Sequence, residues 1–226
     1  MTRYLQRTAK YTFWLGSGFV VVTALMVLAL RWVDPASSAV ISAWERESGR
    51  EAVHQWRPLE QISPNLQVAV IASEDQKFPH HFGFDFAALK KALSEDRGRI
   101  RGASTITQQT AKNLFLWNGR SYVRKALEAW FTVLMEVLWP KERILEVYLN
   151  IAEFGEGVYG AQAAASNFFG TSAQHLNRWQ AGRLAAVLPS PKRMSARNPS
   201  SYVRNRAYTI DRQVRQLGGT GYLGQL

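Results

Sequence analysis

The most apolar stretch of the chain lies near its N-terminus. Residues 11–30, YTFWLGSGFVVVTALMVLAL, hold no charged side chain. A helix rises 1.5 Å per residue, so about twenty apolar residues suffice to cross a hydrocarbon core of about 30 Å. The pattern therefore predicts a transmembrane signal anchor at residues 11–33, preceded by a short N-terminal segment at residues 1–10.

The charges on either side of this stretch predict its orientation. Arg3, Arg7 and Lys10 precede it without any acidic residue, whereas Arg31 and Asp34 follow it. By the positive-inside rule the N-terminus is cytoplasmic and the rest of the chain lies outside. A cleaved signal peptide is the alternative, because small residues follow the stretch. We favour the uncleaved anchor, since the apolar run exceeds the roughly 7 to 15 residues of a signal-peptide core.

Helical periodicity dominates the rest of the chain. Residues 34–64 are interpreted as a membrane-proximal connector with one short helix, SAVISAWERE, and residues 65–226 as one domain. Asn65 is expected to cap the first helix of that domain. Apolar spacings of three and four predict helices at residues 65–77, 86–93, 120–139, 141–154, 177–188 and 202–217. No convincing alternating strand is found, so we expect a mainly α fold.

Composition and charge narrow the classes of function. The absence of cysteine excludes a disulfide scaffold, a thiolate metal site and a cysteine nucleophile. The first 34 residues carry a net charge of +3, which leaves +8 of the total of +11 on the remainder. This excess indicates an anionic partner, such as a phosphorylated substrate or a membrane surface. Nucleic acid is not expected, because the basic helices are predicted to lie outside the cytoplasm and no recognition-helix motif is evident.

Several familiar active sites lack their residues. The chain has no GxxxxGK[ST], HExxH or DxD motif, and it also lacks SxxK, SDN and KTG. These absences exclude an ATPase loop, a zinc protease, a metal-held nucleotide-sugar site and a penicillin-binding acyl-transfer site. Residues 155–160, GEGVYG, match GxGxxG, but they follow an amphipathic helix and not the strand that a dinucleotide-binding turn requires.

A pair of acids ends the first predicted helix of the domain. Glu74 and Asp75 follow an apolar run and precede Phe78 and His81. A carboxylate among apolar neighbours tends toward a raised pKa, which suits a general base. The alternative is that the two acids only terminate a helix face and that His81 caps a turn.

Residues 102–113, GASTITQQTAKN, form a helix-length stretch with almost no charge and hardly any apolar face. Ser104 or Thr105 can cap a helix start. Thr105, Gln109 and Lys112 then share one face, with Gln108 beside them. Neutral donors and acceptors that end in a cation suit the wall of a cleft that binds a sugar or a phosphate.

Two further segments are open to two interpretations each. Arg120, Arg124, Lys125 and Glu128 form a basic cluster around one acid, which ordinary helical ion pairs would also explain. Residues 115–117, FLW, either dip into a membrane interface or belong to the core. The run AWFTVLMEVLW at residues 129–139 is expected to be a buried core helix, because it is short for a span and contains a glutamate.

Five blocks together resemble a known family. They are EDQKFPHHFGFD at 74–85, GASTITQQTAKN at 102–113, RKALE at 124–128, KERILEVYLN at 141–150 and GVYGAQAAASNFFG at 157–170. In this order they resemble the peptidoglycan glycosyltransferases, glycosyltransferase family 51, in their monofunctional membrane-anchored form. The resemblance implies a lysozyme-like glycosyltransferase domain that polymerises lipid II at the outer face of the bacterial cytoplasmic membrane, without transpeptidase activity.

The resemblance also implies roles for individual residues. Glu74 is similar to the general base that deprotonates the acceptor 4-hydroxyl, and Glu128 to a second essential carboxylate that holds the cations of the site or a divalent ion. Lys112, Arg120, Arg124 and Lys125 resemble the group that neutralises the departing pyrophosphate. The remaining expected substrate-binding residues are Ser104, Thr105, Gln108, Gln109, Asn113, Asp75, Phe78 and His81.

Cofactors and partners follow from the same resemblance. No cofactor is expected to be obligatory, although Mg²⁺ or Mn²⁺ could stimulate. The expected partners are lipid II, the growing glycan chain, membrane lipids and other cell-wall synthesis or division proteins.

Elementary chemistry is consistent with this division of roles. Converting an α-linked lipid pyrophosphate into a β-1,4 bond inverts the anomeric carbon, so one displacement suffices and one base is enough. Pyrophosphate leaves as a stable anion that positive charge assists. A lysozyme-like hydrolase or lytic enzyme is the main alternative, but it needs a raised-pKa acid and has no use for the cation cluster. A membrane-tethered binding module would explain the charge and the anchor but not the five polar blocks.

Overall fold

The domain is built around a helix with no side facing solvent. In the computed structural model α3, Pro64–Glu74, buries every residue from Leu66 to Ala72. Burial on all sides is typical of a central helix, and α9 and α10 pack against it. The structure describes residues 2–87, 89–90, 104–119 and 121–226, with the backbone alone for residues 2–9.

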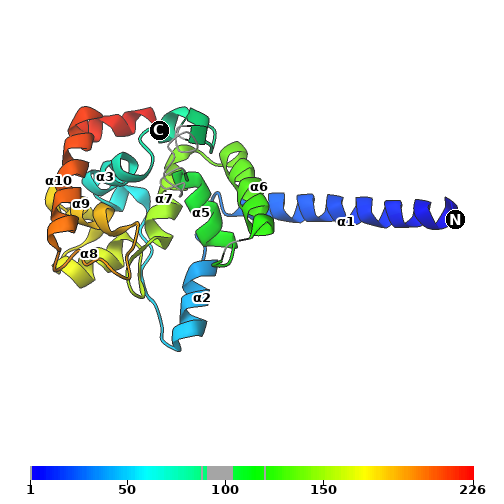
Figure 1. Cartoon of the computed structure of the whole chain (residues 1–226), viewed down its shortest axis with the longest axis horizontal. Helices are drawn as coiled ribbons and strands as arrows, with labels where there is room; N and C mark the ends of the chain where they lie inside the picture. The colour runs from blue at the N-terminus through cyan, green and yellow to red at the C-terminus, as the bar shows by residue number, and fades with distance from the viewer. Residues whose placement is uncertain (1, 88, 91–103, 120) are drawn as a thin grey trace.

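The fold is mainly helical, as the sequence predicted (Figure 1). The other described helices are α1 Thr2–Ala29, α2 Ala39–Ser48, α5 Ile106–Phe115, α6 Tyr122–Leu138, α7 Lys141–Ile151, α8 Ala161–Phe169, α9 Arg178–Val187 and α10 Ser201–Gln216. Single turns of 3-10 helix are η1 Leu59–Gln61, η2 Phe78–His80 and η3 Ala173–His175, and the longer η4 is Gly219–Gln225. Half of the helix predicted at residues 86–93, namely residues 88 and 91–93, lies outside the described residues.

Several helix boundaries differ from the predicted ones, and α3, for example, ends at Glu74 and not at residue 77. Ser63, and not Asn65, caps α3, because Pro64 occupies the first helical position where its missing N–H costs nothing. The hydroxyl of Ser63 accepts from the backbone N–H of Asn65 at 3.3 Å. The last predicted turn of α7 is absent, since the helix ends at Ile151 and the chain continues into a strand.

The expectation of no strands was wrong, because the described chain forms a small three-stranded sheet. Its strands are β1 Val53–His54, β2 Glu153–Gly155 and β3 Val158–Tyr159, in the order β1-β3-β2. β1 runs parallel to β3 and β2 antiparallel to it. Strands of two or three residues are too short to show a period of two, so the pattern could not reveal them. The GEGVYG motif forms the β2–β3 hairpin and not a dinucleotide-binding turn.

The segment predicted as a connector is also part of the domain. Its short helix, α2, is confirmed, and the side chain of Ser38 caps it. Val40, Ile41 and Trp44 of α2 form a second small hydrophobic core with Tyr159 of β3. β1 then adds an edge to the sheet. Residues 39–54 therefore fold with the domain and do not only link it to α1.

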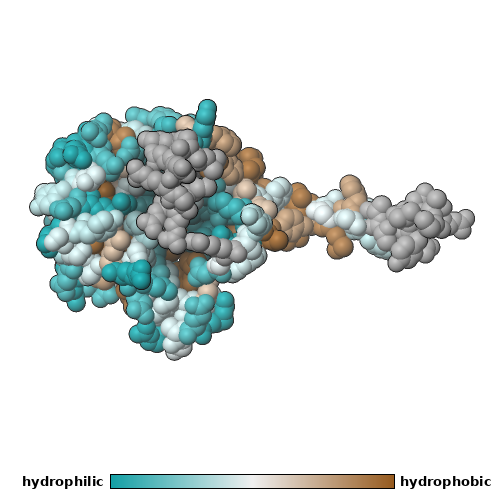
Figure 2. Space-filling model, in the orientation of Figure 1, coloured by the Kyte–Doolittle hydropathy of each residue, from teal (hydrophilic) through white to brown (hydrophobic). Residues whose placement is uncertain are grey.

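Helix α1 extends from the domain as a candidate membrane span. Lys10–Ala29 is long and apolar enough to cross a bilayer, with a mean hydropathy of 2.0, and it is the one such helix among the described residues. Figure 2 shows apolar residues along α1 and where it meets the domain. Helix α6 contains the AWFTVLMEVLW run, and its buried side includes Phe131 and Met135.

The C-terminal end of α1 is attached to α6 and α7 through its backbone. Trp139 donates to the carbonyl of Val27 at 2.7 Å, and Arg143 donates to the carbonyl of Leu30 at 2.9 Å. Arg31 returns a hydrogen bond to the carbonyl of Leu138 at 2.8 Å. These side chains satisfy carbonyls that a helix end leaves without partners, and they hold the domain close to the end of the candidate span.

The turn between β3 and α8 requires a glycine at position 160, which a substitution can test. Gly160 has φ +85°, and a Cβ atom there would lie 2.6 Å from the backbone oxygen of Asn150. Gly170 also has a positive φ, +62°, but a Cβ atom there would meet nothing within 4 Å. We expect Gly160→Ala to cost about 2–3 kcal/mol and to lower the thermal midpoint by roughly 5–10 °C.

Circular dichroism of the full chain in one detergent measures this difference. Gly170→Ala is the matched control, with an expected loss of roughly 2–4 °C from backbone conformation alone. Equal shifts for the two variants would show that the contact with Asn150 carries no cost.

Candidate functional site

Glu74 lies at the point where the central helix leaves the core. It is the last residue of α3, and 14% of its side chain is exposed. Its carboxylate accepts a hydrogen bond from Gln109 of α5 at 3.1 Å and lies 3.9 Å from the guanidinium of Arg206 on α10. The carboxylate is thus shielded from bulk water but still open to a reactant.

This environment changes the acidity of Glu74. Burial raises the pKa of Glu74 above its ordinary value, while the hydrogen bond from Gln109 and the positive charge of Arg206 partly oppose the shift. The negative end of the α3 dipole also disfavours the ionised form. A carboxylate with a raised pKa is a stronger base when ionised, as the sequence interpretation requires.

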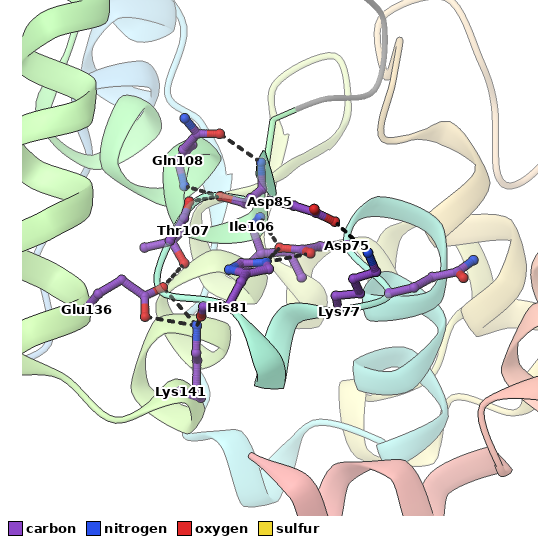
Figure 3. A network of polar contacts seen from close by, with 12 residues as sticks. Asp75, Lys77, His81, Asp85, Ile106, Thr107, Gln108, Glu136 and Lys141 are labelled. Carbon is purple, nitrogen blue, oxygen red and sulfur yellow. Dashed lines mark hydrogen bonds and ion pairs between the residues drawn. The ribbon is translucent and has the colours of Figure 1, made fainter. Parts of the chain in front are cut away.

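Asp75 joins the end of α3 to the start of α5 (Figure 3). Its carboxylate accepts from the backbone N–H of Ile106 at 3.0 Å and from Nε2 of His81 at 2.8 Å. Both Asp75 and His81 are largely buried, and Phe78 is fully buried between them and the core. These three residues were predicted to bind substrate. In the structure they are buried in the loop after Glu74 and stabilise it.

A second buried ion pair holds the same loop. Lys141 of α7 donates to the carbonyl of His81 at 2.7 Å and to Glu136 of α6 at 2.9 Å. Thr107 of α5 donates to the same carboxylate at 2.5 Å. Lys141 also lies 4.6 Å from the centre of the Phe78 ring. Contacts among α5, α6 and α7 thereby hold the loop that follows Glu74 at His81.

In the polar stretch at residues 104–113, some side chains cap α5 and others face the cleft. Thr105 caps α5, and it forms a capping box in which Gln108 accepts from the backbone N–H of Thr105 at 3.1 Å. Thr105 also donates to the carbonyl of Gly83 at 2.7 Å. Ser104 is exposed just before the cap. Thr105 and Gln108 thus start the helix, one turn before the residues that face the cleft.

Gln109 and Lys112 are two residues of α5 whose side chains contact Glu74 or line the cleft. Gln109 donates to Glu74 and accepts from the hydroxyl of Tyr148 at 3.2 Å. Within the described residues the side-chain ammonium of Lys112 forms no hydrogen bond or ion pair. Burial lowers the pKa of Lys112, which Glu128 opposes and Arg124 and Lys125 reinforce. A half-buried ammonium group without a close partner is suited to an anionic ligand.

The basic cluster gathers around Glu128 as predicted. Glu128 is buried, and its two oxygens pair with Arg124 at 2.9 Å and with Lys125 at 2.5 Å. Lys112 of α5 faces the same three charges. Arg120 lies outside the described residues. Glu128 therefore holds two cations beside a third, which concentrates positive charge at one end of α5.

Glu128 is the residue through which the resemblance allows a divalent metal ion. Both oxygens of Glu128 already bind cations, and the described part of the chain holds no group of three Asp, Glu or His side chains that could bind a metal. We therefore derive no step through a metal ion.

A polar cleft of about 260 Å³ lies between α5 and the opposite wall of the domain. Gln109, Lys112 and Asn113 line it from α5, and Tyr148 lies at its base. The facing wall consists of Val40, Trp44, Glu47, Glu153, Tyr159, Leu188, Pro189, Pro191 and Lys192. Phe115 and Leu116 belong to the core or pack on it, whereas Trp117 is 49% exposed.

Sequence reasoning missed two parts of this site. Arg206 belongs to an amphipathic helix without a motif, so nothing local distinguishes it from other arginines of α10. Glu153 lies in β2, and burial raises its pKa while the backbone N–H of Gly157 opposes the shift. Both residues reach the site only through tertiary packing.

Comparison with known proteins identifies the family of this chain. A family model described as "Transglycosylase" matches residues 39–215. A biosynthetic peptidoglycan transglycosylase of Xanthomonas campestris pv. campestris is 56% identical over 213 residues, which cover 91% of this chain and 87% of the relative. Proteins of the same name from Ectopseudomonas mendocina and Pseudomonas putida are 53% and 54% identical, over 98% and 100% of this chain and 93% and 97% of their own lengths. The chain therefore belongs to the transglycosylase family.

Proposed function

We propose that this enzyme polymerises lipid II into β-1,4-linked glycan chains and releases undecaprenyl pyrophosphate, in bacterial cell-wall synthesis. The observation that carries the proposal is the arrangement along α5. Gln109 contacts the carboxylate of Glu74, and Lys112, one turn later, faces the cations held by Glu128. A base and an anion site on one helix are what a single inverting displacement needs.

The proposed reaction is a single displacement at the anomeric carbon of the donor. Glu74 takes the proton from the 4-hydroxyl of the acceptor, and that oxygen forms the new bond to the anomeric carbon of the donor. The bond from this carbon to the pyrophosphate breaks, and the pyrophosphate leaves with the electron pair. Lys112, Arg124 and Lys125 stabilise its charge through charge-assisted contacts. No covalent intermediate is required.

The anchor explains how the site meets lipid substrates. Side chains of α6 and α7 hold the end of α1, so the domain stays next to the membrane surface. We place the N-terminus in the cytoplasm and the catalytic domain at the outer face of the cytoplasmic membrane, because Arg3, Arg7 and Lys10 precede the span. The pyrophosphate headgroup of a membrane-embedded prenyl lipid then lies at the height of the domain.

Replacing the proposed base tests the function directly. We expect Glu74→Gln to lower the turnover of labelled lipid II by at least about 100-fold, because a positioned base contributes roughly 10²–10⁴. Donor binding should stay within about threefold, since the amide keeps the shape of the carboxyl group. Glu60→Gln, at an exposed position, is the control. Near-normal polymerisation by Glu74→Gln would refute this role, and cleavage of preformed glycan by the wild type would indicate a hydrolase.

The pH dependence of the reaction should report the ionisation of Glu74. The base works only when ionised, so kcat/KM falls as pH drops through its raised pKa. Arg206 lowers this pKa, so Arg206→Gln should move the acidic limb of the profile to higher pH. Arg206→Lys keeps the charge and should leave the limb close to that of the wild type. An unchanged limb in Arg206→Gln would mean that another group controls the profile.

Lys112 should affect binding as well as turnover. We expect Lys112→Gln to weaken donor binding by about 10-fold to 100-fold, the usual range for one hydrogen bond to a charged group, and to lower turnover further. Arg204→Gln removes one charge from an exposed position of α10 and serves as the control. Equilibrium binding of lipid II and steady-state polymerisation measure the two effects. Loss of turnover with unchanged binding would contradict a pyrophosphate site at Lys112.

A further inference from the structure

A second concave surface lies away from the catalytic cleft. This distal groove has a volume of about 950 Å³ and joins a smaller hollow of about 240 Å³, with Asn65, Arg178, Asp211 and Arg215 common to both. Its other main lining residues are Asn177, Trp179, Tyr208, Thr209 and Arg212. In the part of the chain that the structure describes, the distal groove and the cleft share no lining residue.

The groove presents two aromatic rings in a fixed arrangement. Trp179 of α9 and Tyr208 of α10 meet edge to face, with ring centres 4.9 Å apart and an angle of 77°. Their side chains are nevertheless 49% and 58% exposed. Each ring is thus held by the other and still offers a free apolar face. A flat aromatic face surrounded by polar groups is well suited to the C–H face of a sugar ring.

Arginine side chains surround this pair. Asp211 is buried and pairs with Arg178 and Arg215, each at 2.6 Å. Arg212 forms no ion pair within the described residues. Three guanidinium groups around one carboxylate leave a net charge of +2. Because a guanidinium has five N–H donors, both paired arginines keep donors for a second carboxylate.

The position of the groove limits what can reach it. Asn65 and Glu74 lie at opposite ends of α3, nine residues apart, which corresponds to about 14 Å along the helix. α9 and α10 form the end of the domain farthest from α1 (Figure 1), and Figure 2 shows that end as mainly hydrophilic. A ligand of the groove therefore extends away from the membrane, unlike a lipid headgroup.

We infer that the distal groove binds the nascent glycan strand, a saccharide chain whose peptides carry carboxylates. This inference rests on the proposed function, which supplies such a strand. The rings would contact sugars, and the arginines would bind the carboxylates. A protein partner fits less well, because the main groove contains no Leu, Ile, Val or Met among its described lining residues, whereas the centre of a protein interface is apolar.

Binding of soluble glycan strands tests the groove without catalysis. Binding is measured by isothermal titration calorimetry of the full chain in detergent. Compared with the wild type, Trp179→Ala should bind at least 10-fold more weakly and Arg212→Gln several-fold more weakly. Tyr202→Ala and Arg204→Gln change exposed residues of α10 outside the groove and should bind as the wild type does. Circular dichroism checks that all variants are folded. Strands without peptides should bind more weakly, and added salt should reduce the difference.

The Lys112→Gln variant separates the groove from the cleft. Strand binding that survives in Lys112→Gln and is lost in Trp179→Ala supports the groove. The reverse pattern, or equal binding by all variants, overturns the inference. Equal binding of strands with and without peptides overturns the proposed arginine contacts. A wild type that binds strands but makes no polymer would refute the proposed polymerase and leave the groove intact.

Discussion

The site depends on the hydrogen bonds accepted by one carboxylate, that of Asp75. It binds the first backbone N–H of α5 and the ring of His81, and so fixes the end of the buried helix α3 against the start of α5. Asp75 also places a negative charge at the positive end of the α5 dipole. Because Glu74 is its neighbour in sequence and Gln109 lies one turn into α5, this junction sets the contact between them. The ion pair of Lys141 with Glu136 stabilises the same loop from the other side.

The two carboxylates near α5 lie in different electrostatic environments. Burial raises the pKa of Glu74, and its one distant cation and the hydrogen bond from Gln109 oppose the shift only in part. Glu128 is a buried carboxylate with two close cations, which keep its charge paired. Lys112 stands between these environments without a close partner among the described residues. The same desolvation that favours a proton on Glu74 makes an anion favourable beside Lys112.

Two helices connect this chemistry to the ends of the molecule. α3 begins at the distal groove and ends at Glu74. α10 carries Arg206, which lies 3.9 Å from Glu74, and Tyr208, which lines the groove. At the other end, α6 and α7 hold the carbonyls of α1. The order membrane span, cleft and distal groove is the order in which the proposed polymer would leave its lipid and grow outward.

The sequence by itself determined the helical class, the apolar span, the polar helix and the acids at the end of α3, because these features depend on local periodicity. The structure decided that Thr105, and not Ser104, caps the polar helix. The family resemblance, carried by five ordered blocks, is confirmed by the comparisons. Tertiary structure alone decided the small sheet, whose strands are too short for a pattern, and the docking of residues 39–54 onto the domain. It also decided that Asp75, Phe78 and His81 are buried at the junction of α3 and α5, that Arg206 lies near Glu74 and that Glu153 lines the cleft. Burial and the approach of distant segments set these roles, and neither is a property of local sequence.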